Sequence, residues 1–430
     1  MFDIKLIREN PELVRKNLER RQDPEKIELL QQIIKDDKKY RELLKEAEDL
    51  KYKRNVLSKE IADLKQEGKD VSSKLKEAQE IPDKIKSLEE NVNKLKEKLD
   101  YALMSLPNLI HESVPFGKDE NDNVEIRKFG KEPKFDFEPK GHAEILTDLG
   151  LLDEERAGKV AGSGFYYLKG SLALMEQAII RYAIDHLVKK GYIFITPPHM
   201  LRRKAYEGVV DLSDFESVMY KIENEDLYLV ATAEHPIGAM YQDEILNKND
   251  LPLKFVGLST NFRREVGAHG KYTKGTFRVH QFNKVEQFIF SLPEQSWKLH
   301  EELQKNAEEL YEGLGLHFRV VDVCTGDIGT IAAKKYDIDI WMADGVFREV
   351  GSNSNCTDYQ ARRLNIRYRE KEGQAPIGFV HTLNNTALAT SRTLIGIVEQ
   401  FQQKDGTVLI PKVLWPYING MKKLEPLKKI

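Results

Sequence analysis

Charged and aromatic side chains alternate along residues 278–287, RVHQFNKVEQ. If this segment is a strand within 278–291, alternate residues share a face. One face would then carry Arg278, His280, Phe282, Lys284 and Glu286, and the other would carry Val279, Val285 and Ile289. The first face could stack a base, bind a phosphate and receive an ammonium or hydroxyl group. A strand face that is simply solvated is the alternative interpretation.

A second group of charges lies just upstream, in Leu258–Glu265, LSTNFRRE. Arg263 and Glu265 share strand parity with Asn261, and the planar guanidinium suits a phosphate or carboxylate. The next segment, 266–276, predicts a mobile, anion-binding loop because it is rich in glycine and basic side chains: Gly267, Gly270, Gly275, His269, Lys271 and Lys274.

A third candidate is Arg392, within an apolar helix that we expect over Ala387–Gln403. A buried arginine needs a partner, and a nucleotide phosphate would serve. A position at the helix edge is the alternative. Asn384 and Thr386 would then cap the start of that helix.

Several kinds of site are excluded by the sequence. No GxxxxGK[ST], HExxH or GxSxG motif occurs, and position 167 is Tyr, so the segment beginning Gly162-Ser-Gly fails the dinucleotide pattern. Cys324 and Cys356 form no CxxC pair, so no zinc site is expected. Single histidines, His235, His269 and His280, are weak candidates for metal ligands.

The elements that must position these residues are short strands and amphipathic helices. Strands are expected at 192–196, 227–231, 253–260, 278–291, 318–323 and 347–351, and helices at 172–190, 294–313 and 387–403. The strands cluster and do not alternate regularly with helices. We therefore predict an α+β fold with an antiparallel sheet flanked by helices.

Residues 27–105 have a different character. Apolar residues recur at Ile81, Ile85, Leu88, Val92, Leu95 and Leu99, with the alternating steps of a coiled-coil seam. A looser series precedes them, and residues 66–73 break the pattern. We predict a long antiparallel helical hairpin with its tip at that break. It would serve as a dimerisation stalk or reach a large partner such as RNA.

Composition narrows the class of protein. The 430 residues carry 67 Lys+Arg and 70 Asp+Glu, a formal charge of −3, which argues against RNA binding through bulk positive charge. The longest stretch without charged residues contains His381 and two asparagines and is no membrane span. The charged first ten residues and only two cysteines favour a cytoplasmic protein.

The three arginine-bearing or helical segments, in this order, resemble the motifs of class II aminoacyl-tRNA synthetases. Gly191–Pro198 resembles motif 1, a dimer-interface element, Phe262–Glu265 resembles motif 2, and the helix with Arg392 resembles motif 3. Within that class the sequence is most similar to the seryl-tRNA synthetases of the standard, non-zinc type. The resemblance rests on TAE at 232–234, FRREVG, FRVHQFNKVEQF, FREVGSNSNCTDYQARRLNIRY and HTLNNTALATSR, and it extends over essentially the whole chain.

The resemblance implies that ATP and Mg²⁺ bind to these motifs. Arg263 would hold the ATP α-phosphate and the serine carboxylate, Arg278 the γ-phosphate, and Arg392 the triphosphate. Phe282 would stack on adenine, whose amino group would donate to Glu265, and Glu349 and Ser352 would hold Mg²⁺. Neighbouring residues complete the implied ATP site: Arg264, Val279, Val350 and Gly351. Because strand parity puts 349 and 352 on opposite faces, the strand must end or bulge there.

The resemblance also implies a serine pocket built from Thr232, Ala233, Glu234, Glu286 and Thr386, together with Arg263. Glu286 would receive the substrate hydroxyl or ammonium. The reaction would be serine activation to seryl-adenylate, with Arg263, Arg392 and Glu349 as the catalytic groups, and transfer to tRNA(Ser); tRNA(Sec) is a second candidate acceptor.

The resemblance further implies a homodimer and a domain order. Residues 1–110 would bind the tRNA through the arm (27–105) across the dimer, residues 111–140 would be a linker, and residues 141–430 would be the catalytic domain. Two positions depart from the family pattern: Asn385 takes the place of a glycine, where it could crowd the pocket or cap the helix, and Val266 replaces an alanine.

Three other functions stay open on the sequence alone. A paralogue could activate an amino acid for an acceptor other than tRNA, although the intact arm argues against it. A non-catalytic RNA-binding protein is the second alternative, although such a protein would not need the charged residues of all three motifs. A class II enzyme for another amino acid is the third alternative.

Overall fold

The computed structural model describes residues 1–211, 217–265 and 276–427. The chain divides into two compact units, Met1–Pro107 and Asn108–Ile430. In the described ranges, no helix combines the length and the apolar character that crossing a membrane requires.

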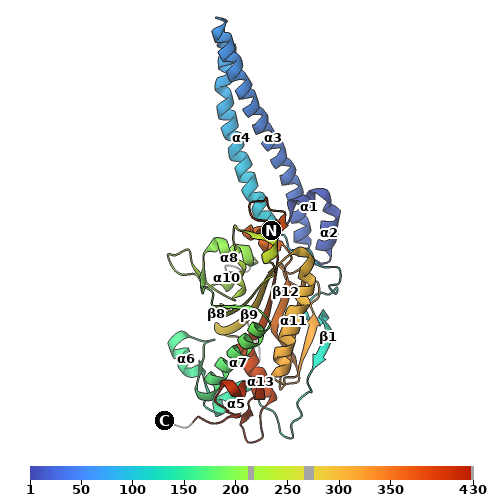
Figure 1. Cartoon of the computed structure of the whole chain (residues 1–430), viewed down its shortest axis with the longest axis vertical. Coiled ribbons are helices and arrows are strands. Elements are labelled where there is room, and N and C mark those ends of the chain that lie inside the picture. The colour runs from blue at the N-terminus through green and yellow to red at the C-terminus, as the bar shows by residue number, and fades with distance from the viewer. Residues whose placement is uncertain (212–216, 266–275, 428–430) are drawn as a thin grey trace. The chain divides into compact units, whose positions relative to one another are not determined.

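The first unit is a helical arm (Figure 1). Two short helices, α1 (Ile4–Glu9) and α2 (Pro11–Glu19), precede two long ones, α3 (Pro24–Gln66) and α4 (Ser72–Ser105), which lie side by side. Asp23 caps α3 by accepting from the backbone N–H groups of Glu25 and Lys26. Apolar side chains close the hairpin near its tip: Leu57, Ile61, Ile81 and Ile85. The predicted antiparallel coiled-coil arm is confirmed, with its turn between α3 and α4.

An eight-stranded sheet forms the centre of the second unit, in the order β1-β10-β11-β12-β15-β9-β8-β4. Its strands are β1 (Val124–Phe129), β4 (Ile193–Ile195), β8 (Leu253–Phe262), β9 (Gln281–Ser291), β10 (Phe318–Asp322), β11 (Lys334–Trp341), β12 (Phe347–Asn355) and β15 (His381–Ala389). All neighbours are antiparallel except β4, which runs parallel to β8. The predicted α+β core with an antiparallel sheet is therefore confirmed.

Alternation along β9 divides the sheet into two faces. Val285 and Ile289 pack into a large apolar core with helices α7 (Gly170–Lys189), α11 (Ser296–Gly313) and α13 (Thr390–Gln400). We call this side of the sheet the core face. Phe288 and Phe290 lie on the opposite face, in a second core with α8 (Arg203–Val209), α10 (Glu234–Gly238) and α12 (Tyr359–Leu364). We call this opposite face, which also carries Glu286, the site face.

Smaller elements complete the second unit. They are α5 (His142–Asp148), α6 (Glu154–Ala161), β2 (Leu152–Asp153), β3 (Tyr167–Leu168), β5 (Met200–Leu201), β6 (Tyr228–Leu229), β7 (Ile245–Asn247), β13 (Arg367–Arg369), β14 (Gly378–Phe379), β16 (Val408–Leu409) and β17 (Lys423–Leu424).

Strands β1, β11 and β15 were not predicted, and two boundaries differ where candidate site residues lie. The strand expected over 278–291 begins at Gln281, so Arg278 and His280 precede it. The helix expected from Ala387 begins at Thr390, because 381–389 form β15 between β12 and β9. Asn384 and Thr386 are therefore strand residues and not helix caps. The polar run hides this central strand, since a buried strand usually reads as apolar.

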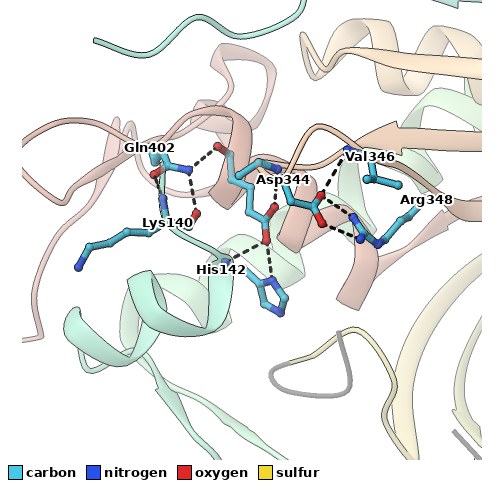
Figure 2. Close-up of polar contacts among 8 residues, drawn as sticks. Lys140, His142, Asp344, Val346, Arg348 and Gln402 are labelled. Carbon is cyan, nitrogen blue, oxygen red and sulfur yellow. Dashed lines mark hydrogen bonds and ion pairs between the residues drawn. The ribbon is translucent and has the colours of Figure 1, made fainter. Parts of the chain in front are cut away.

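A buried carboxylate fastens the end of α13 to its surroundings (Figure 2). Glu399 accepts from the backbone N–H of His142 at 3.0 Å and from that of Ala343 at 2.8 Å, and it lies 2.7 Å from His142 Nδ1. Beside it, Gln402 exchanges two hydrogen bonds with the backbone of Lys140, at 2.8 and 3.0 Å. These contacts join α13 to α5 and to the turn that follows β11.

Replacing Glu399 with Gln should destabilise the second unit. Gln has one acceptor oxygen where Glu399 has two, so an amide N–H₂ would face a buried N–H group. We expect the free energy of unfolding to fall by about 1–3 kcal/mol. Urea unfolding followed by fluorescence measures this well, because all three tryptophans, Trp297, Trp341 and Trp415, belong to this unit.

Glu155→Gln is the matched control, because the Glu155 side chain is 80% exposed. It should change stability by no more than about 0.5 kcal/mol. Equal effects of the two substitutions would contradict the role assigned to Glu399.

Candidate active site

A cavity of about 440 Å³ lies on the site face of the sheet. Segments far apart in the sequence converge on it: the residues after β8, then β9, β12, β15, α10 and the start of α13. Predicted site residues that line it are Thr232, Glu234, Arg263, Glu265, Val279, Phe282, Glu286, Glu349, Val350, Gly351, Ser352, Thr386 and Arg392.

One half of the cavity presents guanidinium groups whose partners are mostly uncharged. Arg263 donates from Nε to the carbonyl of Ala231 at 3.3 Å, and its guanidinium carbon lies 5.3 Å from the centre of the Phe282 ring. Arg392 donates from Nη1 to the carbonyl of Glu349 at 2.6 Å, with the Glu349 carboxylate 3.8 Å away. Carbonyls and rings orient a cation without neutralising it, so this half can still bind an anion.

A bulge brings Glu349 and Ser352 together. Ile338 of β11 pairs with Gly351 and Asp339 pairs with Glu349, so β12 contains one extra residue, Val350. The two side chains therefore share the cavity, and Ser352 Oγ donates to Glu349 Oε1 at 3.3 Å. The strand was expected to end or bulge here, and the structure shows a bulge.

Opposing effects act on the Glu349 carboxylate. The side chain is 50% exposed. Its partial loss of solvent disfavours the charge, but the positive charges of Arg392, Lys335 and Arg263 keep its pKa below the usual value. Glu349 is therefore an anion at neutral pH beside a hydroxyl group, and this oxygen pair suits a hard divalent cation.

The rim of the cavity carries a weaker ion pair. Arg278, whose side chain is 49% exposed, lies with Nη1 3.8 Å from Glu265 Oε2. Arg278 does not line the cavity itself, while Glu265 does. The predicted anion-binding loop, with Gly267, Gly270, Gly275, His269, Lys271, Lys274 and the departure Val266, lies outside the described residues at 266–275.

The other half of the cavity is lined by two carboxylates. Oε1 of Glu234 accepts from Gln360 Nε2 at 2.9 Å and from Asn384 Nδ2 at 3.1 Å. Burial, followed by the charge of Glu286, raises the pKa of Glu234 to about 7. Glu286 forms an ion pair with Lys284 and lies 3.4 Å from Thr386 Oγ1. This half can bind a small molecule that carries an ammonium and a hydroxyl group.

Two predicted residues lie away from the cavity. Ala233 is fully buried in the second core, and Arg264 donates its backbone N–H to the carbonyl of Val218. Asn385 neither crowds the cavity nor caps a helix: its Nδ2 donates to the carbonyl of Leu303 in α11 at 2.6 Å, on the core face.

Sequence reasoning missed Asn384 as a site residue and placed Lys284 on the face of Glu286 without assigning it a role, although both line the cavity. Strand parity could have found Asn384, since Asn384 shares the face of Thr386 once β15 is known to be a strand.

The single histidines do not gather into a metal site. In the part of the chain that the structure describes, no three His, Cys, Asp or Glu side chains group as metal ligands. His235 lines the cavity, but burial holds its pKa well below the usual value, so it is neutral. His280 Nδ1 lies 2.7 Å from Tyr220 Oη. His269 lies outside the described residues.

Comparison with known proteins gives two family matches. The family model "Seryl-tRNA synthetase N-terminal domain" matches residues 1–110. The model "tRNA synthetase class II core domain (G, H, P, S and T)" matches residues 217–401.

Relatives and solved structures agree with these matches over the full length. A serine–tRNA ligase from Methanocorpusculum labreanum is 53% identical over 99% of this chain and 100% of its own. The crystal structure of seryl-tRNA synthetase from Pyrococcus horikoshii complexed with ATP is 49% identical, with a TM-score of 0.95 over 100% of both chains. The cytoplasmic serine–tRNA ligase from Naegleria fowleri in complex with AMP is 35% identical, with a TM-score of 0.89 over 100% of this chain and 99% of its own.

The raised pKa of Glu234 predicts a pH-dependent effect of Glu234→Gln on stability. The native state binds a proton at Glu234 more tightly than the unfolded state does, so this group's contribution to stability is lost as pH rises from about 4.5 to about 7. Gln keeps the acceptor oxygen for Gln360 and Asn384 but has no charge to bury. We expect Glu234→Gln to become more stabilising by about 1–3 kcal/mol between pH 5 and pH 8.

Urea unfolding at several pH values measures this difference. Glu223→Gln is the control, because Glu223 is an exposed carboxylate of the same unit, and its effect should not change across that range. A pH-independent effect of Glu234→Gln would show that Glu234 is already ionised without cost in the native state.

Proposed function

The chain belongs to the seryl-tRNA synthetases, the serine–tRNA ligases of class II, and we propose that its cavity joins L-serine to ATP and passes the serine to tRNA(Ser). The observation that carries this proposal is that one cavity is lined both by arginines and by buried carboxylates. One half offers Arg263 and Arg392 to phosphates, and the other offers Glu234 and Glu286 to an amino acid.

ATP occupies the guanidinium half in this proposal. Arg263 binds the α-phosphate, Arg392 the triphosphate and Arg278 the γ-phosphate from the rim. Phe282 stacks on adenine, and Glu265 accepts from its amino group. The weak ion pair between Arg278 and Glu265, at 3.8 Å, costs little to open when the nucleotide enters.

We also propose that Mg²⁺ binds with ATP to Glu349 and Ser352. The residues fit this ion, because the bulge in β12 puts a carboxylate and a hydroxyl oxygen within hydrogen-bonding distance on the cavity wall. When bound, the ion supplies neutralisation of the phosphate charge. The chain's own part is to hold Glu349 ionised beside Arg392.

Serine occupies the carboxylate half. In this proposal its carboxylate contacts Arg263 of the guanidinium half, and its ammonium contacts Glu234 and Thr232. Its hydroxyl group contacts Glu286 and Thr386. An amino acid without the hydroxyl leaves buried polar groups unpaired, which gives discrimination against alanine.

The reaction needs no nucleophile from the protein. A serine carboxylate oxygen attacks the α-phosphorus, and the bond to the bridging oxygen of pyrophosphate breaks, so that pyrophosphate leaves with the electron pair. The terminal ribose hydroxyl of tRNA then attacks the acyl carbon, the bond from that carbon to the phosphate oxygen breaks, AMP leaves with the electron pair, and the hydroxyl proton passes to a phosphate oxygen of AMP. Arg263 and Arg392 act by position and charge, because negative charge is shared over the phosphate oxygens in both steps.

Two assemblies belong to the proposal. Exposed apolar side chains of α7, β4 and β5 favour a homodimer through this surface: Leu174, Val188, Ile193, Phe194 and Met200. The helical arm binds tRNA(Ser) across that dimer by its shape, and tRNA(Sec) is a second candidate acceptor.

A cytoplasmic location is supported by two buried, free cysteines.

Arg392→Ala should abolish adenylate formation, because the triphosphate loses a charge that the active site cannot replace. We expect serine-dependent ATP–pyrophosphate exchange to fall by at least about 100-fold. Arg348→Ala is the control, since Arg348 lies on the same strand as Glu349 but pairs with Asp344 away from the cavity. Near-normal exchange by Arg392→Ala would refute the phosphate role.

Shortening the arm should separate the two steps. Residues 48–86 can be replaced by a short glycine-rich turn, which leaves the lower hairpin with its Lys98–Asp36 ion pair at 2.7 Å. We expect serine-dependent exchange to stay within about twofold of that of the full chain. Charging of tRNA(Ser) at limiting tRNA should fall by at least about 100-fold, because the loss of several phosphate contacts weakens binding on that scale. Retained charging would refute the role of the arm.

A further inference from the structure

Lys284 is a buried cation in the amino-acid half of the cavity for which the proposed reaction has no use. Its side chain is 8% exposed, and its Nζ forms an ion pair with Glu286 Oε2. Thr386 Oγ1 lies 3.4 Å from both Lys284 Nζ and Glu286 Oε2, so the three side chains form a closed group. They belong to neighbouring strands, with Glu286 opposite Thr386 in the register of β9 and β15.

A charge count shows why this group needs a cation. Serine enters as a zwitterion, and its carboxylate and ammonium would match Arg263 and Glu234. The serine hydroxyl is neutral, so the negative charge of Glu286, which is 1% exposed, would have no counter-charge from the substrate. An unpaired buried carboxylate is strongly unfavourable and takes up a proton instead.

We propose that Lys284 determines specificity by neutralising Glu286, so that this carboxylate accepts a hydrogen bond from a neutral hydroxyl and excludes an ammonium group in the same place. Without Lys284, the pocket would carry one more negative than positive charge. It would then favour an amino acid whose side chain is a cation of the size of hydroxymethyl. L-2,3-diaminopropionate, with an aminomethyl side chain, is that amino acid.

The electrostatic surroundings support this assignment. Burial raises the pKa of Glu286, and the ammonium of Lys284 is the largest influence that opposes the rise. Arg263 and Thr386 oppose it less. The inference rests on the proposed function, since it names how that same pocket selects its amino acid.

The test compares serine with L-2,3-diaminopropionate as substrates for ATP–pyrophosphate exchange by the full-length protein. For Lys284→Met we expect kcat/KM for serine to fall by about 10- to 100-fold, mainly through KM, as for the loss of about 1–3 kcal/mol of binding, with the KM for ATP unchanged. The ratio of kcat/KM for serine to that for diaminopropionate should fall by at least about 100-fold. An unchanged ratio would overturn the proposal.

Lys334→Met is a matched control. Lys334 is similarly buried, at 10% exposed, and pairs with Asp322 at 2.9 Å, but it does not line the cavity. Its loss should affect folding as much as that of Lys284 and leave the substrate ratio unchanged. A changed ratio in this control would show that destabilisation alone alters selectivity, and would overturn the proposal.

A double-mutant cycle keeps the proposal testable if Lys284→Met folds poorly or if serine supports no exchange. In the Glu286→Gln background there is no charge to neutralise, so adding Lys284→Met should lower the melting temperature by less than it does in the wild type. Equal shifts in the two backgrounds would overturn the neutralising role. Absence of serine-dependent exchange in the wild type would refute the proposed function separately, because the cycle does not use catalysis.

Discussion

Burial of matched charges on one face of an antiparallel sheet is the constraint on which the rest of the catalytic unit depends. Glu286 and Lys284 occupy same-face positions of β9, and each makes the burial of the other tolerable. Glu234 accepts hydrogen bonds from two amide groups. Its pKa is raised mainly because burial removes the solvent that would stabilise its charge. Strand pairing allows this arrangement, because the backbone is satisfied within the sheet while the side chains alternate between faces.

The core face gives these charges fixed positions. The carbonyl of Leu303 in α11 accepts from Asn385 at 2.6 Å and from Gln287 at 3.3 Å, which ties the two central strands to one helix. Glu399 fastens the far end of α13, the helix whose first turn carries Arg392. Side chains held in fixed positions suit a reaction that depends on position and charge. The charged groups of the cavity then need no rearrangement when charge develops on the phosphates.

The sequence predicted those parts of the structure whose patterns are local. The coiled-coil seam from Ile81 to Leu99, and the helices near 172–190 and 294–313, follow from apolar spacing alone. The family resemblance assigned Glu349 and Ser352 to one site, which required β12 to end or bulge between them, and the structure has a bulge there. The strand β15 was missed because its polar residues bind Glu234 and α11, partners that no local pattern reveals. For the same reason Asn384 was not recognised as a site residue.

In the proposed enzyme, one cavity joins a triphosphate site to a pocket for serine. The most direct test is ATP–pyrophosphate exchange in the absence of tRNA, measured with each of the twenty amino acids in turn. We expect exchange with serine at least about 100-fold above that with any other amino acid, because only serine pairs every buried polar group of the pocket. Exchange with no amino acid, or with one other than serine, would contradict it.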